Sequence, residues 1–258
     1  MTGPSAPVSP LQAGRVQLTV AEGIGRVTFG HPRSNSLPGA LLAQLAATIA
    51  EAGRREDVRV ILLESEGTGA FCAGASFDEL KAIENGAQGK QFFSGFAKVI
   101  LAMIRAPKFV VTRVHGKAAG GGVGLIAASD YAVATAGASV KLSELAVGIG
   151  PFVVGPVIEK KIGLGAYQAM SVDADWRSAE WGANAGLYAA VAEDVAAVDT
   201  LVASRTAWLA RMNPAAMKQL KAVFWEGTEE WDTLLARRAE MSGTLVLTEP
   251  ARAAIRKA

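Results

Sequence analysis

The stretch His115-Gly116-Lys117-Ala118-Ala119-Gly120-Gly121-Gly122, followed directly by the apolar run 123–127, is the most informative part of this sequence. Three consecutive glycines before an apolar helix leave bare backbone N–H groups at the positive end of the helix dipole. That arrangement suits a phosphate group or a developing oxyanion. A dinucleotide-binding fingerprint is matched only loosely, because the spaced glycines fall inside the predicted helix rather than in the turn before it. Taken alone, the stretch is explained equally well by close helix packing.

Two further stretches carry candidate chemistry. Phe71-Cys72-Ala73-Gly74-Ala75-Ser76 is a run of mostly small residues that lets the backbone approach a ligand and turn its N–H groups outward. An ordinary tight turn is the alternative. Glu144 stands beside an apolar, glycine-rich segment that ends at residue 155. Burial there would raise the pKa of its carboxyl group and suit it to proton abstraction at neutral pH. An exposed loop glutamate is the alternative.

Together, the three stretches resemble the crotonase (enoyl-CoA hydratase/isomerase) superfamily. Its pattern is Phe-x-Ala-Gly-Ala-Asp, then Asn-Gly-x-Ala-x-Gly-Gly-Gly, then Pro-Glu with Gly and Pro at fixed offsets, which Gly148 and Pro151 match here. Further matches are His31-Pro32 with Asn35-Ser36-Leu37, and the segment 183–187. The resemblance covers roughly residues 15–257. It implies an α/β fold, a crotonase-like spiral of ββα units with a C-terminal helical region.

Hydrophobic periodicity is consistent with a layered α/β fold. It predicts strands at 16–20, 26–29, 58–63, 109–114 and 131–134, and helices at 37–54, 92–104, 203–211, 215–225 and 229–242, with a final helix after Thr248. The segment 116–128 begins glycine-rich and is predicted to become an apolar helix. We expect a flexible leader over residues 1–14, the spiral core over 15–200 and the helical region over 201–258. The resemblance implies that the helical region is used in oligomerisation, as a homotrimer or a hexamer built as a dimer of trimers.

Composition narrows the functional class. The chain has 258 residues, of which 50% are hydrophobic and 19% charged, and its net charge is +2. That balance gives no reason to expect nucleic acid or an acidic membrane surface as a partner. The single cysteine, Cys72, allows no internal disulfide and fits a reducing compartment. We see no signal peptide and no run long enough to span a membrane, so a soluble, cytoplasmic protein is expected.

The resemblance also implies a site. The oxyanion-hole amides would be those of Ala75 and Gly121, and Glu144 would be the base. Removing a proton beside a thioester carbonyl places negative charge on the carbonyl oxygen, which two preorganised N–H donors stabilise. The coenzyme A part of the acyl-CoA substrate would be bound by Arg33, Ser34, Ser36, Ala73 and Ala75, with Gly121 at the thioester. No tightly bound cofactor and no metal are expected.

Departures from the family pattern bear on the reaction. Hydratases of the family use a second glutamate, whose position is Gly124 here, and the acidic residue of dienoyl isomerases falls on Phe152. Asp78 replaces a lysine that can bind a CoA phosphate in hydratases of the family, so Lys81 or Arg33 would have to bind that phosphate here. A single carboxylate can move a proton between two carbons, which favours Δ3,Δ2-enoyl-CoA isomerisation. Placing Glu at Gly124 is then expected to add hydration without harming the fold.

Several alternatives remain open at this point. The chain could be a hydratase, a thioesterase, a decarboxylase or a non-catalytic acyl-CoA binder, although Glu144 argues against a pure binder. Cys72 is interpreted as a packed apolar residue rather than a nucleophile, because no histidine has the motif context of a paired base. His115 is interpreted as a turn residue. Trp176 and Trp181 are predicted to serve the core or an interface.

Overall fold

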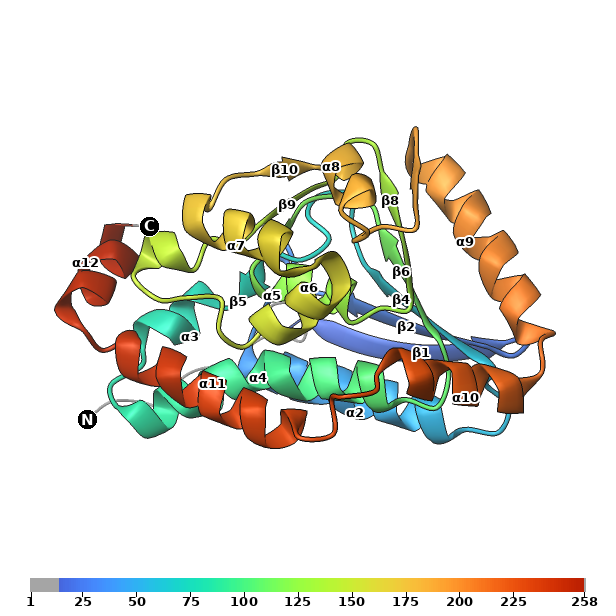
Figure 1. Cartoon of the computed structure of the whole chain (residues 1–258), viewed down its shortest axis with the longest axis horizontal. Coiled ribbons are helices and arrows are strands. Elements are labelled where there is room, and N and C mark those ends of the chain that lie inside the picture. The colour runs from blue at the N-terminus through green and yellow to red at the C-terminus, as the bar shows by residue number, and fades with distance from the viewer. Residues whose placement is uncertain (1–13, 258) are drawn as a thin grey trace, which may run out of the picture.

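The computed structural model describes residues 14–257, so nearly all of the predicted leader lies outside the described residues. The largest sheet has six strands in the order β1-β2-β4-β6-β8-β11 (Figure 1). β1 and β2 form an antiparallel hairpin, and each later neighbouring pair is parallel. The strand bounds are β1 Arg15–Ala21, β2 Ile24–Gly30, β4 Val60–Ser65, β6 Val110–Val114, β8 Tyr131–Thr135 and β11 Ala190–Ala192.

The central strands β4, β6 and β8 are buried on both faces, which explains why their sequences are almost continuously apolar. Successive side chains of a strand point to opposite faces. In β4, Ile61 and Leu63 therefore join the main core, whereas Val60 and Leu62 join a second cluster on the other face. Figure 1 shows α9 (Val195–Ala210) on this second side of the sheet, away from α5 (Gly121–Ala127) and α6 (Gly155–Ile162).

Two smaller sheets connect the segments that carry the conspicuous motifs. β3 (Ser36–Leu37) pairs in parallel with β5 (Gly74–Ala75). β7 (Ala118–Ala119) pairs in parallel with β9 (Ser139–Lys141), which pairs in turn with β10 (Arg177–Ser178). A bridge between Cys72 and Ala118 links these two groups of strands. Segments far apart in the sequence are thereby held side by side.

The helices cover the sheet and form an extended C-terminal region. Their bounds are α2 Gly39–Arg54, α3 Phe77–Lys81, α4 Gly86–Arg105, α5 Gly121–Ala127, η1 (a 3-10 turn) Leu145–Val147, α6 Gly155–Ile162, α7 Leu164–Asp173, α8 Ala179–Asn184, α9 Val195–Ala210, α10 Pro214–Phe224, α11 Trp231–Leu245 and α12 Glu249–Lys257. α11 packs along α4, and α12 lies against α3 and η1 (Figure 1). In residues 14–257, no helix combines the length and apolarity that a membrane crossing requires.

Two helices begin earlier than the apolar pattern predicts, and in both cases a capping side chain is the reason. The Asn85 side chain accepts a hydrogen bond from the backbone N–H of Gln88 at 3.0 Å, so α4 starts at residue 86 rather than 92. Asp194 likewise accepts from the N–H of Ala197 at 2.8 Å, and α9 starts at residue 195. α9 therefore runs through the predicted boundary near residue 200 and packs on the central sheet.

Candidate active site

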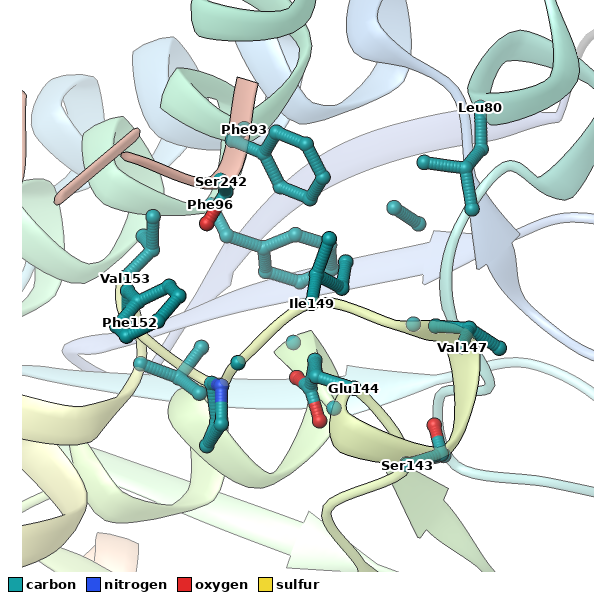
Figure 2. A pocket seen from close by; sticks show the side chains of 18 of the residues that line it. Leu80, Phe93, Phe96, Ser143, Glu144, Val147, Ile149, Phe152, Val153 and Ser242 are labelled. Atoms are coloured by element: carbon teal, nitrogen blue, oxygen red, sulfur yellow. The ribbon is translucent and has the colours of Figure 1, made fainter. Parts of the chain in front are cut away.

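One pocket collects the three residues that the sequence marks as catalytic. Ala75, Gly121 and Glu144 all line a cavity of about 120 Å³ (Figure 2). Of the described residues that line it, Glu144 alone is ionisable. The remaining walls are largely apolar, and they are formed by Ala73, Gly74, Phe77, Leu80, Phe92, Phe93, Phe96, Ala119, Gly120, Ser143, Val147, Ile149, Gly150, Pro151, Phe152, Val153, Val154 and Ser242.

Ala75 is held by the short β3–β5 pair. The Ser36 hydroxyl donates a hydrogen bond to the Ala75 carbonyl at 2.9 Å, and the Ser76 N–H donates to the Leu37 carbonyl at 3.0 Å. The preceding loop is fixed by the buried Asn35, whose amide donates to two carbonyl groups of the 66–70 turn, each at 2.9 Å. The Asn-Ser-Leu motif therefore supports the candidate oxyanion-hole strand.

Gly121 is the first residue of α5, so its N–H has no acceptor within the helix. The preceding residue, Gly120, has a φ of +50°, a conformation that glycine adopts readily. Its N–H donates a hydrogen bond to the Lys141 carbonyl at 2.9 Å. The two candidate amide segments lie against each other. A Cβ atom built on Gly74 would be 3.2 Å from the Ala119 carbonyl oxygen and 3.9 Å from the Gly121 nitrogen.

The Glu144 carboxyl group adjoins the same backbone. A Cβ atom on Gly120 would lie 2.8 Å from Glu144 Oε1, which places the carboxyl beside the peptide that carries the Gly121 N–H. Its Oε2 atom is buried and has no hydrogen-bond partner among the described residues. Burial raises the pKa of Glu144 to about 7, partly opposed by the N–H groups of Glu144 and Ser143. Such a carboxyl can accept and release a proton near neutral pH.

Gly124 occupies the position of the second family glutamate, and the structure shows no space for a side chain there. A Cβ atom on Gly124 would lie 2.7 Å from Val154 Cγ1 and 3.3 Å from Ile100 Cδ1. The expectation that a glutamate at this position would leave the fold unharmed is therefore wrong. Two apolar side chains fill the space that a second acid would need.

Phe152, at the position of the dienoyl-isomerase acid, contributes its ring to the pocket wall. Figure 2 shows the Glu144 carboxyl among apolar side chains, with Phe93, Phe96 and Phe152 on other walls of the pocket. A Cβ atom on Gly121 would meet the Phe96 ring at 2.3 Å, so this ring lies directly on the start of α5. The surroundings of the candidate base are therefore largely apolar and aromatic.

Two residues of the predicted coenzyme-binding strip, Ala73 and Ala75, line the pocket. Arg33 forms an ion pair with Asp78, the residue that replaces the family lysine. Both side chains are more than half exposed, so this pair is readily exchanged for another partner. Lys81 extends over the Phe77 ring, with its nitrogen 5.4 Å from the ring centre. The Ser34 carbonyl accepts from the Ala73 N–H at 3.2 Å, which joins two predicted contact residues.

Cys72 and His115 serve the framework of the site. Cys72 is fully buried, and burial raises the pKa of its thiol to about 12, so the thiol stays protonated. A Cβ atom on Gly122 would lie 2.5 Å from the Cys72 carbonyl oxygen, which shows close packing. His115 follows β6, is buried, and its Nδ1 lies 3.1 Å from an Arg113 nitrogen. The interpretation of Cys72 as a packing residue agrees with this geometry.

The tryptophans have mixed environments. Trp181 packs against the main core, as predicted. Trp176 is 45% exposed, and the ammonium groups of Lys117 and Lys141 lie 5.1 Å and 6.0 Å from its ring centre. Within the part of the chain that the structure describes, no group of three or more His, Cys, Asp or Glu residues is arranged to hold a metal ion.

The sequence does not indicate that α11 contributes to the pocket. Ser242 reaches it from α11, and Leu80 and Ile149 belong to a cluster that also contains Val246 and Ile255 of the C-terminal region. At Gly148, whose φ is +78°, a Cβ atom would lie 2.6 Å from Ala251 Cα. The stripe of phenylalanines on α4 could have suggested an apolar pocket, but no local signal in the sequence indicates Ser242.

Comparison with known proteins agrees with this geometry. The family model described as enoyl-CoA hydratase/isomerase matches residues 19–250. The crystal structure of an enoyl-CoA hydratase from Bacillus halodurans superposes with a TM-score of 0.87 at 18% identity, covering 94% of this chain and 99% of that one. The crystal structure of a putative enoyl-CoA hydratase from Mycobacterium avium paratuberculosis K-10 superposes with a TM-score of 0.81 at 27% identity, covering 94% of this chain and 95% of that one.

Curated relatives differ in their reactions. The chain is 33% identical over 132 residues to a (7aS)-7a-methyl-1,5-dioxo-2,3,5,6,7,7a-hexahydro-1H-indene-carboxyl-CoA hydrolase of Rhodococcus jostii, covering 51% of each chain. It is 26% identical over 130 residues to an ethylmalonyl-CoA decarboxylase of Gallus gallus, covering 50% of this chain and 43% of the relative. The chain thus spans about half the length of these relatives. It has the α/β crotonase fold with C-terminal helices, and it belongs to the crotonase (enoyl-CoA hydratase/isomerase) superfamily.

Proposed function

We propose that this acyl-CoA enzyme shifts the double bond of a 3-enoyl-CoA to the 2-position. Members of the family act on CoA thioesters, typically without a tightly bound cofactor. The observation that carries the proposal is the position of Glu144. Its carboxyl group, with a pKa raised by burial to about 7, adjoins the Gly121 amide, while Val154 and Ile100 fill the space of a second acid.

The reaction follows from these groups. Glu144 removes a proton from C2 of the bound 3-enoyl-CoA, and the electron pair delocalises onto the thioester oxygen. The N–H groups of Ala75 and Gly121 stabilise this negative charge, and one such donor contributes on the order of 3 kcal/mol in a dry site. The protonated Glu144 then returns the proton to C4. The double bond moves from C3–C4 to C2–C3, and no atom is gained or lost.

Hydration requires more than this site offers. A water molecule must be aimed at C3 while a proton is delivered to C2, which in family hydratases is the task of two glutamates. Here the second position is closed by apolar side chains that pack on Gly124. The apolar lining of the pocket also strengthens the hydrogen bonds to the enolate, because the local dielectric constant is low. Both features favour proton transfer between carbons over the addition of water.

Loss of carbon dioxide from a carboxylated acyl-CoA is the second candidate. It generates the same enolate in the same pair of amides, and it needs no second acid. The similarity to ethylmalonyl-CoA decarboxylases supports this alternative. Glu144 would then supply the proton to C2 after the carbon–carbon bond has broken.

We further propose that the coenzyme part of the substrate lies along Arg33, Ser34, Ser36 and Ala73, with Lys81 as the available cation. Arg33 would exchange its exposed partner Asp78 for a phosphate group. Because the candidate strip belongs to the same loop that positions Ala75, binding of the coenzyme would place the thioester at the two amides.

The test is a direct product analysis. The purified protein is incubated separately with a 3-enoyl-CoA and with the corresponding 2-enoyl-CoA, and the products are followed by absorbance and mass spectrometry. We expect conversion of the 3-enoyl ester into the conjugated 2-enoyl ester, with little or no mass gain from water. Rapid hydration of the 2-enoyl ester with no change in the 3-enoyl ester would refute the proposal.

A further inference from the structure

Ser242 is a polar residue on the buried side of α11, and it forms part of the pocket wall. Its side chain is only 1% exposed. The helix comes this close to the pocket because α11 and α4 touch at two glycines. A Cβ atom on Gly89 of α4 would lie 2.6 Å from Gly243 Cα. Ser242 directly precedes this contact, so even its short side chain reaches the cavity.

The Ser242 hydroxyl group is not used by the protein itself. A helical serine or threonine can donate its hydroxyl hydrogen to the carbonyl four residues earlier. Ser94, Ser171 and Thr244 do so, at 2.6, 2.8 and 3.0 Å. The Ser242 hydroxyl forms no hydrogen bond within residues 14–257, and Figure 2 shows its oxygen directed toward the side of the pocket formed by Val153. It therefore keeps a donor and an acceptor for a bound molecule.

The position of Ser242 indicates which part of a substrate it would contact. Figure 2 shows Glu144 and Ser242 on different walls of the pocket, separated by apolar side chains that include Ile149. In the proposed reaction Glu144 acts on C2 and C4, so a group at Ser242 belongs to the chain beyond C4. No described residue that lines the pocket carries a positive charge. A carboxylate would therefore be buried without a counterion, whereas an uncharged oxygen needs only the hydroxyl group.

We propose that the Ser242 hydroxyl binds an uncharged oxygen of the acyl chain, so that the substrates are acyl-CoA esters with a hydroxyl or keto group beyond C4. Serine suits both groups, because its hydroxyl donates to a keto oxygen and accepts from a hydroxyl. In a largely apolar wall this one hydrogen bond decides the selectivity, since a polar group buried without a partner is disfavoured. The inference rests on the proposed function in that an acyl-CoA occupies the pocket with its reacting carbons at Glu144.

Calorimetric titration with saturated esters measures binding separately from the reaction. Hexanoyl-CoA is compared with 5-hydroxyhexanoyl-, 5-oxohexanoyl- and 6-hydroxyhexanoyl-CoA, each of which carries one additional oxygen beyond C4. We expect at least one oxygenated ester to bind the wild-type protein about fivefold more tightly than hexanoyl-CoA. Ser242→Ala should weaken the binding of that ester about tenfold or more, because its oxygen is then buried without a partner. The affinity for hexanoyl-CoA should stay within about twofold of the wild-type value.

Thr244→Val is the matched control, since it removes a hydroxyl from the exposed side of the same helix, and we expect it to keep the preference. Ser242→Cys, whose thiol is only a weak donor, should lose the preference and guards against a folding defect in the alanine variant. The inference is overturned if the wild-type protein binds hexanoyl-CoA but prefers none of the oxygenated esters, or if a preference persists in both Ser242 variants. If none of the four esters binds, the proposed function fails, and this inference fails with it.

Discussion

At the scale of single residues, the account depends on how Glu144 is surrounded. A carboxyl group in water is ionised at neutral pH and is a poor base, whereas the buried carboxyl of Glu144 has its pKa raised to about 7. Among residues 14–257, the Oε2 atom of Glu144 has no hydrogen-bond partner, so it can accept a proton from a substrate. The two properties together distinguish Glu144 from the exposed glutamates of the chain.

The first prediction concerns turnover. Glu144→Gln keeps the size of the side chain but removes the base, so we expect kcat to fall by about 10²–10⁴-fold while acyl-CoA binding is retained. In the wild-type protein, kcat/KM should rise with pH and level off above the pKa of about 7, because only the ionised carboxylate accepts a proton. Near-normal activity in the glutamine variant would remove Glu144 from the mechanism.

The second prediction concerns stability. The pKa of Glu144 is raised from 4.5 to about 7, so between these values the folded state holds a proton that the unfolded state has released. The stability of the wild-type protein should therefore fall across this window as pH rises. Glu144→Gln avoids this loss. At pH 8 the free energy of unfolding of this variant should therefore exceed that of the wild-type protein by on the order of 3 kcal/mol, and the difference should vanish near pH 4. Denaturant unfolding at both pH values measures it, and an equal difference at both would contradict the burial of the carboxyl.

At the scale of elements, the start of α5 determines which reactions are possible. We predict that Gly124→Glu alone destabilises the protein and adds no hydratase activity, because its side chain collides with Val154. The double variant Gly124→Glu/Val154→Ala should recover stability by removing the contacting methyl groups. It should also gain measurable hydration of a 2-enoyl-CoA. Recovery of folding without any hydration would mean that the second acid is not the missing component.

The sequence predicted those elements whose signals are local. The glycine run before α5, the strand at 58–63 and the Phe-x-Ala-Gly-Ala turn each lie within a few residues, and the structure joins Ala75, Gly121 and Glu144 in one pocket. The starts of α4 and α9 were missed because polar caps precede the apolar residues. Ser242 and the packing of Val154 on Gly124 depend on contacts between distant segments, which periodicity cannot indicate.

At the scale of the whole molecule, the C-terminal helices present much apolar surface. Large hydrophobic side chains remain exposed on α9 and α10, namely Val195, Leu201, Trp208, Leu220, Val223 and Phe224. Exposed apolar groups on neighbouring helices are typical of subunit contacts. We predict that the protein is a homotrimer or a dimer of trimers, as its resemblance implies. Analytical ultracentrifugation at micromolar concentration checks this prediction, and a stable monomer would contradict it.

The central claim is that a thioester oxygen sits between two backbone amides beside Glu144. The most direct measurement is a crystal structure of the Glu144→Gln variant with a bound 3-enoyl-CoA. The account predicts that the thioester oxygen lies about 3 Å from the nitrogens of both Ala75 and Gly121, with C2 of the acyl chain next to residue 144. A thioester oxygen that contacts neither N–H group, or an acyl chain that points away from residue 144, would contradict it.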